Sequence, residues 1–295
     1  MELNKKQIYG LIGCPVKHSF SAAMHNAAFT HLGMNAEYKL FEINPQELKY
    51  FFHRIIPLKD INGEEFSYND LHGFNVTIPH KEAVLEFLNE TSSAAVDIKA
   101  VNTISVYNGS EFKGINTDFL GFTRHITEMD VNTGKVGMIG AGGAARAVAY
   151  ALKVKKALEL VIYDQDNQKA KLLARDVNSW DSTCSAYAVD SIEALNLYDK
   201  TLLVNASPVG MQDSDPLLIS EKMLHKDLFV YDLIYNPSDT KLLMLAKDQG
   251  LRCRNGLKML LYQGVLAFEH WSGIDAPKEA MFEALKGEIN ASDNT

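Results

Sequence analysis

Cysteine is scarce in this sequence, and none of it stands in a pairing or metal-binding pattern. Cys14, Cys184 and Cys253 are far apart, odd in number and form no Cys-x-x-Cys, so we expect buried, reduced thiols rather than a disulfide framework. His-Glu-x-x-His is also missing, and the histidines are scattered. These absences argue against a zinc site, and we expect no metal.

Long apolar runs and an excess of positive charge are absent as well. No apolar stretch is long enough to span a membrane, and MELNKKQIYGLIG at the N-terminus lacks the apolar core and cleavage site of a signal peptide. The net charge is −8, with Lys+Arg 29 against Asp+Glu 37, which leaves no electrostatic footprint for nucleic acid or an anionic membrane. We expect a cytoplasmic protein, monomer or homodimer, that acts on a small molecule.

Strand-like and helix-like segments alternate along nearly the whole chain. QIYGLIG and LHGFNVTI have the pattern of strands, SAAMHNAAFTHLG that of a helix, and Asn108-Gly109 predicts a hairpin. From VGMIG onward the alternation is very regular. Such alternation favours an α/β fold with parallel strands. Residues 57–70 are expected to form a polar loop, and a helix is expected from Lys81.

A glycine-rich turn follows one of these strands. In VGMIGAGGAARAV, Gly140 would permit a tight turn, Gly142 would let the backbone approach a pyrophosphate, and Ala145 would let the helix pack closely on the strand. The next strand ends at Asp164, where a carboxylate can accept hydrogen bonds from an adenosine ribose. We therefore predict a doubly wound Rossmann dinucleotide-binding domain at residues 119–255, and a mixed α/β substrate domain made of residues 1–118 plus 256–295.

Asp164 also carries the predicted choice of cofactor. A 2′-phosphate would meet a like charge there, and the residues that follow, Gln165, Asp166 and Asn167, include no arginine. Lys169 could meet a phosphate from the next helix, but as a mobile point charge. We therefore expect NAD(H), with NADP(H) as the alternative.

The segment FNVTIPHKEAV raises the question of catalysis, because it places an amine where a buried strand ends. A nicotinamide enzyme that acts on an alcohol needs a proton carrier beside the hydride path. Lys81 is the candidate, and Asp118 in INTDFLGF is its expected partner, since both stand where a strand gives way to a helix. The plain alternative is a solvated lysine on a first helical turn. His80 is the histidine considered for the same role.

At these motifs the chain resembles the shikimate/quinate dehydrogenase family. The likeness covers nearly the whole chain, and the order and spacing of its motifs make it specific. It implies reversible, nicotinamide-dependent reduction of 3-dehydroshikimate to shikimate, in the biosynthesis of chorismate and the aromatic amino acids. The shared motifs are GCPVKHSFS (13–21), GFNVTIPHK (73–81), AVNT (100–103), GINTD (114–118), GAGGAAR (140–146), NASPVGM (205–211), DLIYNP (232–237) and GLKMLLYQG (256–264).

The resemblance also implies roles for individual residues. Lys81 would exchange the proton at the carbonyl being reduced, with Asp118 as its partner. Ser19 and Ser21 would bind the ring carboxylate, because hydroxyls donate without adding charge. The ring hydroxyls would be held by Thr77, Asn102, Asp118 and Gln263, with Tyr235 lining the site. The cofactor would lie against Gly140, Ala141, Gly142, Gly143, Ala144, Asp164, Ser207, Leu233, Gly256 and Met259.

Three departures from the family pattern stand out, and three alternatives stay open. Ala22 replaces a usual proline, Phe119 replaces a usual glycine, and the strand end at 163–165 lacks the Asn-Arg-Thr/Ser of NADP-using members. One alternative is an NAD-dependent enzyme that also takes quinate in a catabolic role. A folate-type methylene dehydrogenase shares the two-domain plan, but the serine pair speaks against it. A non-catalytic nucleotide sensor would need neither Lys81 nor Asp118.

Overall fold

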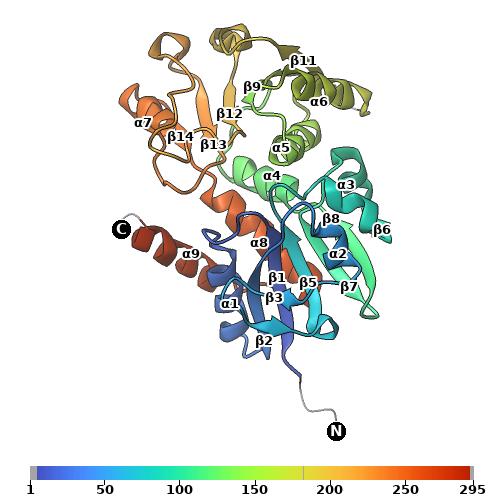
Figure 1. Ribbon diagram of the computed structural model, residues 1–295. Helices are drawn as coiled ribbons and strands as arrows, with labels where there is room; N and C mark the ends of the chain where they lie inside the picture. The colour runs from blue at the N-terminus through green and yellow to red at the C-terminus, as the bar shows by residue number, and fades with distance from the viewer. Residues whose placement is uncertain (1–4, 182, 293–295) are drawn as a thin grey trace. The chain divides into compact units, whose positions relative to one another are not determined.

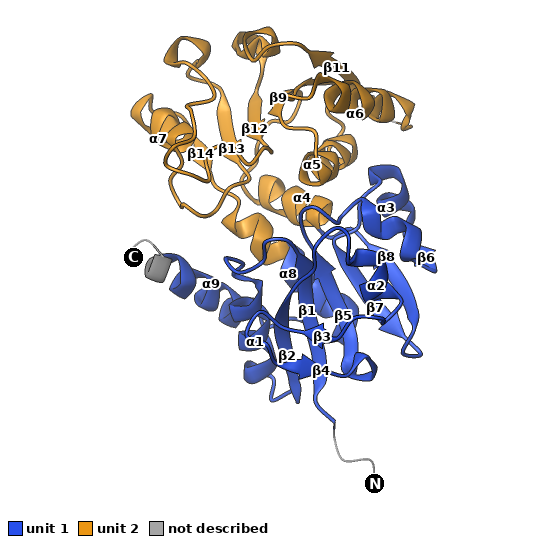
Figure 2. Cartoon of the chain, viewed as in Figure 1, with its two compact units in different colours: residues 1–117, 263–295 blue, residues 118–262 orange. Residues whose placement is uncertain are grey.

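The chain divides after Thr117 and again after Tyr262. The computed structural model describes residues 5–181 and 183–292. Unit 1 comprises residues 1–117 and 263–295, and unit 2 comprises residues 118–262 (Figure 2). The expected boundary at 255/256 would have preceded helix α8 (Leu257–Ser272), whereas the second division falls inside that helix. Met259, in the first turn of α8, belongs to the apolar core of unit 2, which keeps the start of the helix in that unit.

Unit 1 is built on a mixed sheet in the order β2-β1-β5-β7-β8-β6 (Figure 1). Parallel pairs join β1 (Gln7–Gly13) to β2 (Ala36–Glu42) and to β5 (Leu71–Val76). β7 (Thr103–Tyr107) runs antiparallel to β5 and to β8 (Glu111–Ile115), and β6 (Glu90–Thr91) runs parallel to β8. The helices of this unit include α1 (Ser21–His31), α2 (Leu48–Phe52), α3 (Ser93–Ile98) and α9 (Lys278–Ser292).

Turn chemistry accounts for the hairpins of unit 1. The predicted β7–β8 hairpin is confirmed, with positive φ at both Asn108 and Gly109, as a type I′ turn requires. The expected loop at 57–70 instead contains a short antiparallel pair, β3 (Leu58–Lys59) and β4 (Glu65–Phe66), and a 3₁₀ turn, η1 (Tyr68–Asp70). The helix expected from Lys81 is a 3₁₀ helix, η2 (Ala83–Phe87).

Unit 2 is a parallel sheet in the order β11-β10-β9-β12-β13-β14. Numbered from its own first strand this is 3-2-1-4-5-6, the Rossmann order, so the predicted doubly wound domain is confirmed. Its strands are β9 (Lys135–Ile139), β10 (Glu159–Tyr163), β11 (Ser185–Val189), β12 (Leu202–Asn205), β13 (Phe229–Asp232) and β14 (Cys253–Arg254). Its helices include α4 (Asp118–Glu128), α5 (Gly143–Val154), α6 (Asn167–Ser179) and α7 (Lys241–Asp248), and its 3₁₀ turns are η3 (Glu193–Leu195), η4 (Leu197–Asp199) and η5 (Glu221–Met223).

Each unit has an apolar core of its own. In unit 1, the rings of Phe51 and Phe74 pack edge to face with centroids 5.4 Å apart. In unit 2, the helix faces of α5 and α6 bury alanine, valine and leucine against the central strands. None of the helices in the described part of the chain has both the length and the apolar character needed to cross a membrane.

Candidate functional site

The glycine-rich turn lies at the carboxyl end of β9, next to the point where the strand order reverses. Gly140 has a φ of +106°, and a Cβ there would come within 2.8 Å of the backbone of Ala206, so only glycine fits. A Cβ on Gly142 would meet no described atom within 4 Å. α5 begins at Gly143, and the N–H groups of its first turn have no acceptor within the helix. Backbone donors at a helix N-terminus suit a pyrophosphate.

Asp164 follows β10 and is tied to the same turn. One carboxylate oxygen accepts the Ala141 N–H at 2.7 Å, and the other accepts the Asp166 N–H at 2.8 Å. Asp166 in turn caps α6 by accepting the Gln168 N–H at 3.1 Å. Asp164 therefore has a structural task, which is to hold the glycine-rich turn and the start of α6.

The remaining predicted cofactor residues follow β12, β13 and β14. The Ser207 hydroxyl donates to Oδ1 of Asn205 at 2.7 Å. Gly256 packs on Leu233 so closely that a Cβ would lie 2.0 Å from the Leu233 carbonyl oxygen. Met259 is buried, with 7% of its surface exposed. Gly140, Ser207, Leu233 and Gly256 thus lie at the carboxyl ends of neighbouring strands.

In unit 1, the segments around Lys81 and Asn102 are hydrogen-bonded to each other. The Val101 N–H donates to the Lys81 carbonyl at 2.8 Å, and the Thr77 N–H donates to Ile12 at 2.9 Å. Lys81 is half-buried. The predicted catalytic pair is divided between the units, because Lys81 follows β5 in unit 1 and Asp118 is the first residue of α4 in unit 2.

Two residues expected to hold ring hydroxyls are in direct contact. Asn102 Nδ2 donates to Gln263 Oε1 at 3.2 Å and to Thr117 Oγ1 at 3.0 Å, while Asn102 Oδ1 accepts the Thr117 N–H at 2.7 Å. Both Asn102 and Gln263 are buried. Gln263 therefore joins the C-terminal segment of unit 1 to its sheet through a polar contact.

The two predicted carboxylate-binding serines are also neighbours. Ser19 Oγ donates to Ser21 Oγ at 3.2 Å and accepts the Ser21 N–H at 3.3 Å. Ser21 begins α1, and its hydroxyl hydrogen-bonds the buried Tyr38 phenol, which works against the rise in the pKa of Tyr38 caused by burial.

Sequence reasoning missed a buried polar link behind these residues. The Tyr38 hydroxyl donates to Asn75 Oδ1 at 2.8 Å, and Asn75 Nδ2 donates to the Asn102 carbonyl at 3.1 Å and to Thr103 Oγ1 at 3.0 Å. Buried hydrogen bonds through Tyr38 and Asn75 therefore connect Ser21 to the backbone of Asn102. Asn75 was visible as a polar residue between the apolar positions of a buried strand.

Two histidines of unit 1 are buried in its interior. His80, considered for chemistry, is buried, and its Nε2 lies 2.6 Å from the Ile43 carbonyl; burial lowers its pKa. His25 is fully buried and stacks on Tyr38 with centroids 4.5 Å apart. Burial lowers the pKa of His25 to about 3, so its ring is neutral.

The structure also gives the positions of Phe119, Ala22 and Tyr235. Phe119 packs its ring edge-on against Tyr150 of α5, with centroids 5.0 Å apart. Ala22 is in the first turn of α1, and Tyr235 follows β13, half-buried. No cluster of three or more His, Cys, Asp or Glu side chains suited to a metal ion occurs within residues 5–181 and 183–292.

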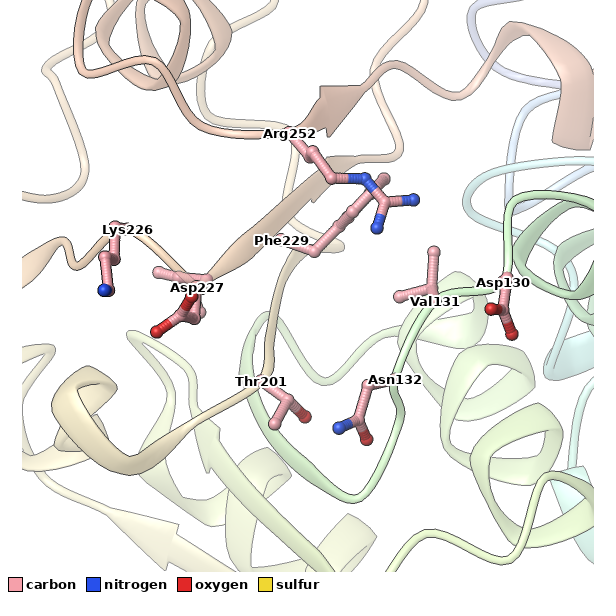
Figure 3. Close-up of a pocket in the computed structure, with 9 residues that line it drawn as sticks. Asp130, Val131, Asn132, Thr201, Lys226, Asp227, Phe229 and Arg252 are labelled. Atoms are coloured by element: carbon pink, nitrogen blue, oxygen red, sulfur yellow. The ribbon is translucent and has the colours of Figure 1, made fainter.

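A cavity in unit 2 lies away from all these residues. It has a volume of about 230 Å³ and is lined by residues that include Asn132, Thr201, Phe229 and Arg252 (Figure 3). Thr201, Phe229 and Arg252 stand at the amino ends of β12, β13 and β14. Dinucleotides bind at the carboxyl ends of such strands, so this cavity is not the cofactor site.

The chain is similar to known proteins along almost its whole length. A family model described as the shikimate dehydrogenase substrate binding domain matches residues 11–104, and one described as the shikimate 5'-dehydrogenase C-terminal domain matches residues 256–286. The shikimate dehydrogenase (NADP(+)) of Methanopyrus kandleri is 42% identical over 94% of this chain and 94% of its own. Its namesake from Desulforamulus reducens is 42% identical over 97% and 96%.

A solved structure agrees with these sequence relatives. Shikimate dehydrogenase from Aquifex aeolicus superposes with a TM-score of 0.84 at 36% identity, covering 97% of this chain and 100% of that one. These relatives do not favour the alternative of a catabolic quinate enzyme.

The expected preference for NAD is wrong. The curated relatives are named for NADP(+). The error came from treating Asp164 as a carboxylate reserved for the ribose hydroxyls. Both of its oxygens accept backbone N–H groups, so an aspartate at this position has a structural reason that does not depend on the identity of the nucleotide.

Proposed function

Because this chain belongs to the shikimate dehydrogenase family, we propose that it catalyses the reversible reduction of 3-dehydroshikimate to shikimate with NADP(H), as a step of aromatic biosynthesis in the cytoplasm. The observation that carries the proposal is the connected polar cluster of unit 1. It joins Ser19 and Ser21 through Tyr38 and Asn75 to Asn102. A small ring with a carboxylate at one end and hydroxyls at the other matches that distribution of donors.

The substrate residues have separate tasks in this proposal. Ser19 and Ser21 donate to the ring carboxylate, whose charge is the same before and after reduction. Asn102 and Gln263 hold ring hydroxyls, with Thr77 and Tyr235 beside them. Because these groups bind parts of the substrate that do not react, they contribute to binding more than to the chemical step.

Lys81 is the proposed proton donor in reduction and acceptor in oxidation, at the oxygen bonded to the reacting carbon. Asp118 is proposed to orient the Lys81 ammonium and to accept a hydrogen bond from a ring hydroxyl. Since oxidation requires the amine to accept a proton, the oxidative rate should rise at alkaline pH.

The residues of unit 2 fit a dinucleotide. The pyrophosphate would lie against the backbone of Gly140, Ala141, Gly142, Gly143 and Ala144, where a Cβ on Gly142 would meet no described atom within 4 Å. The nicotinamide cofactor supplies the hydride when it is bound. Ser207, Leu233, Gly256 and Met259 would border its nicotinamide half.

A 2′-phosphate requires a cation near the end of β10. Lys169 is exposed in the first turn of α6, and Arg175 lies two turns further along with 69% of its side chain exposed. We propose that Lys169 or Arg175 meets the phosphate. Asp164 would keep its hydrogen bonds to the backbone of Ala141 and Asp166.

Initial rates test the proposal. Purified protein is assayed with shikimate and with quinate, each at saturating NADP, by following absorbance of the reduced cofactor. We expect turnover of shikimate and a much smaller kcat/KM for quinate. Absence of shikimate turnover would contradict the proposed function, and a larger kcat/KM for quinate would contradict the substrate.

A further inference from the structure

Asp232 is a buried carboxylate that none of the proposed roles uses. It ends β13, and none of its surface is exposed. Oδ1 accepts the Asn205 side-chain N–H at 3.0 Å and the Ile234 backbone N–H at 3.1 Å. Oδ2 accepts the Thr240 hydroxyl at 2.7 Å. Its three partners are uncharged donors that come from three different segments.

Each partner fixes one of those segments. Asn205 ends β12, accepts the Ser207 N–H at 3.1 Å and the Ser207 hydroxyl at 2.7 Å, and donates to the Val209 carbonyl at 3.1 Å. Ile234 belongs to the loop after β13, and its carbonyl accepts the Gly256 N–H at 3.1 Å. Thr240 caps α7 by accepting the Leu243 N–H at 3.2 Å.

We propose that Asp232 is a positioning residue for the nicotinamide half of the cofactor site. It acts through Asn205 on the loop that carries Ser207, and through the Ile234 backbone on Leu233 and the start of α8. It does not touch the cofactor itself. The inference rests on the proposed function, because that function assigns the nicotinamide to these loops.

The physical cost of this arrangement supports a role beyond packing. A buried carboxylate is unfavourable unless it is paired with a cation, and burial raises the pKa of Asp232 to about 6. Both of its oxygens are hydrogen-bonded to donors supplied by other segments. An asparagine would keep one carbonyl oxygen for Asn205 and Ile234, and its amide could donate to the Thr240 oxygen. Asn is therefore the conservative replacement, and alanine removes all three bonds.

Binding of NADPH, followed by its own fluorescence without shikimate, tests the inference. We expect Asp232→Ala to raise the dissociation constant for NADPH about tenfold, because losing hydrogen bonds to a charged group typically changes an equilibrium constant by about that factor. Asp232→Asn should stay within about twofold of wild type. The matched control is Asp60→Ala in unit 1, where a buried aspartate also accepts backbone N–H groups, from Asn62 and Glu64.

The control separates positioning from loss of stability. Asp60→Ala should lower the melting temperature and leave NADPH binding unchanged. An unchanged dissociation constant in Asp232→Ala would overturn the inference, and so would an equal loss in Asp60→Ala. If Asp232→Ala does not fold, Thr240→Val decides, because it conserves volume and removes the Thr240 bond to Asp232; it also removes the α7 cap bond from Leu243, so its binding is measured well below its melting temperature. It should weaken NADPH binding about two- to fivefold, and unchanged binding would overturn the inference.

Failure of the inference and failure of the proposed function give different results. If wild type turns over shikimate with NADP and Asp232→Ala binds NADPH normally, the function stands and the inference falls. If wild type binds NADPH but does not turn over shikimate, the substrate assignment falls, while the binding series still reports on Asp232. If wild type does not bind NADPH, both fall.

Discussion

Two side chains near the proposed site have hydrogen-bond partners that their positions in the sequence did not indicate. Asp164 stands at the expected strand end, yet it braces the glycine-rich turn. His80 stands beside Lys81, yet its ring is used on the Ile43 carbonyl. In both, the decisive information is the hydrogen-bond partner, which sequence spacing does not contain. Lys81 is the residue on which the proposed chemistry depends most directly.

Replacing Lys81 by alanine should lower kcat about 10²–10⁴-fold, because a positioned general acid–base group typically contributes that much. The protein should stay folded, since the side chain is only half-buried. Steady-state rates in both directions, with circular dichroism as the check on folding, measure this. Lys59→Ala is the matched control, an exposed lysine of unit 1 paired with Glu65, and it should keep wild-type kcat. Near wild-type turnover in Lys81→Ala would remove Lys81 from the chemistry.

Asp232 should make stability depend on pH in a defined window. Burial raises the pKa of Asp232 from 3.8 to about 6 in the folded protein, so between these values the native state binds more protons than the unfolded state. The contribution of Asp232 to the free energy of unfolding therefore falls as pH rises from about 4 to about 6, by about 2–3 kcal/mol.

Urea denaturation at a series of pH values measures this contribution. Asp232→Asn cannot titrate, so its free energy of unfolding relative to wild type should increase across the window and stay level above it. A difference that does not change with pH would show that Asp232 titrates alike in the folded and unfolded states.

Elements were predictable where periodicity and turn chemistry agree. The β7–β8 hairpin follows from Asn108-Gly109, and the strand–turn–helix from β9 to α5 follows from its glycines. The β3–β4 pair was missed although Asn62-Gly63 offers the same dipeptide signal, because the flanking residues do not alternate. The turn between these two short strands is stabilised by Asp60, whose carboxylate accepts two backbone N–H groups across it.

Other elements depend on contacts that are distant in sequence. The 3₁₀ form of η2 and the position of the unit boundary inside α8 have no local signal. The polar links around Asn75 and Asp232 were equally hidden, since each pairs residues from separate strands. The sequence thus indicates which segments would carry the proposed site, and the structure shows the hydrogen bonds that hold those segments.

Position 140, in the turn after β9, should tolerate no side chain. Gly140→Ala combines a φ of +106° with a Cβ placed 2.8 Å from the Ala206 backbone, so we expect a large fall in melting temperature and loss of NADPH binding. Gly250→Ala separates the two effects, because Gly250 has a φ of +70° with no described atom within 4 Å of its Cβ position. It should cost about 1 kcal/mol from strain alone. Equal losses in the two variants would show that the contact with Ala206 is unimportant.

At the scale of the whole molecule, the two units should respond to different ligands. Amide exchange slows where binding suppresses local opening. NADP should protect the ends of β9, β12 and β13 in unit 2, and shikimate should protect the segments around Ser21 and Asn102 in unit 1. Hydrogen–deuterium exchange with mass spectrometry, with each ligand added alone, measures both. Protection of the Asn102 segment by NADP alone, equal to that by shikimate, would contradict the division of tasks.

Unit 1 is made from two segments that are separated in sequence by the whole of unit 2, and this affects how it folds during synthesis. The Ile104 carbonyl, on β7, accepts the Trp271 indole N–H at 3.0 Å, and Asn102 bonds Gln263. Domains generally fold as units during synthesis, the N-terminal part first. Residues 1–117 cannot complete unit 1 until residues 263–295 have been made. Unit 2 is continuous, so it has all its strands before then. The strands of the unit 1 sheet are all made by residue 115, so what forms last is the packing of the C-terminal segment on that sheet, through the contacts of Gln263 with Asn102 and of Trp271 with Ile104.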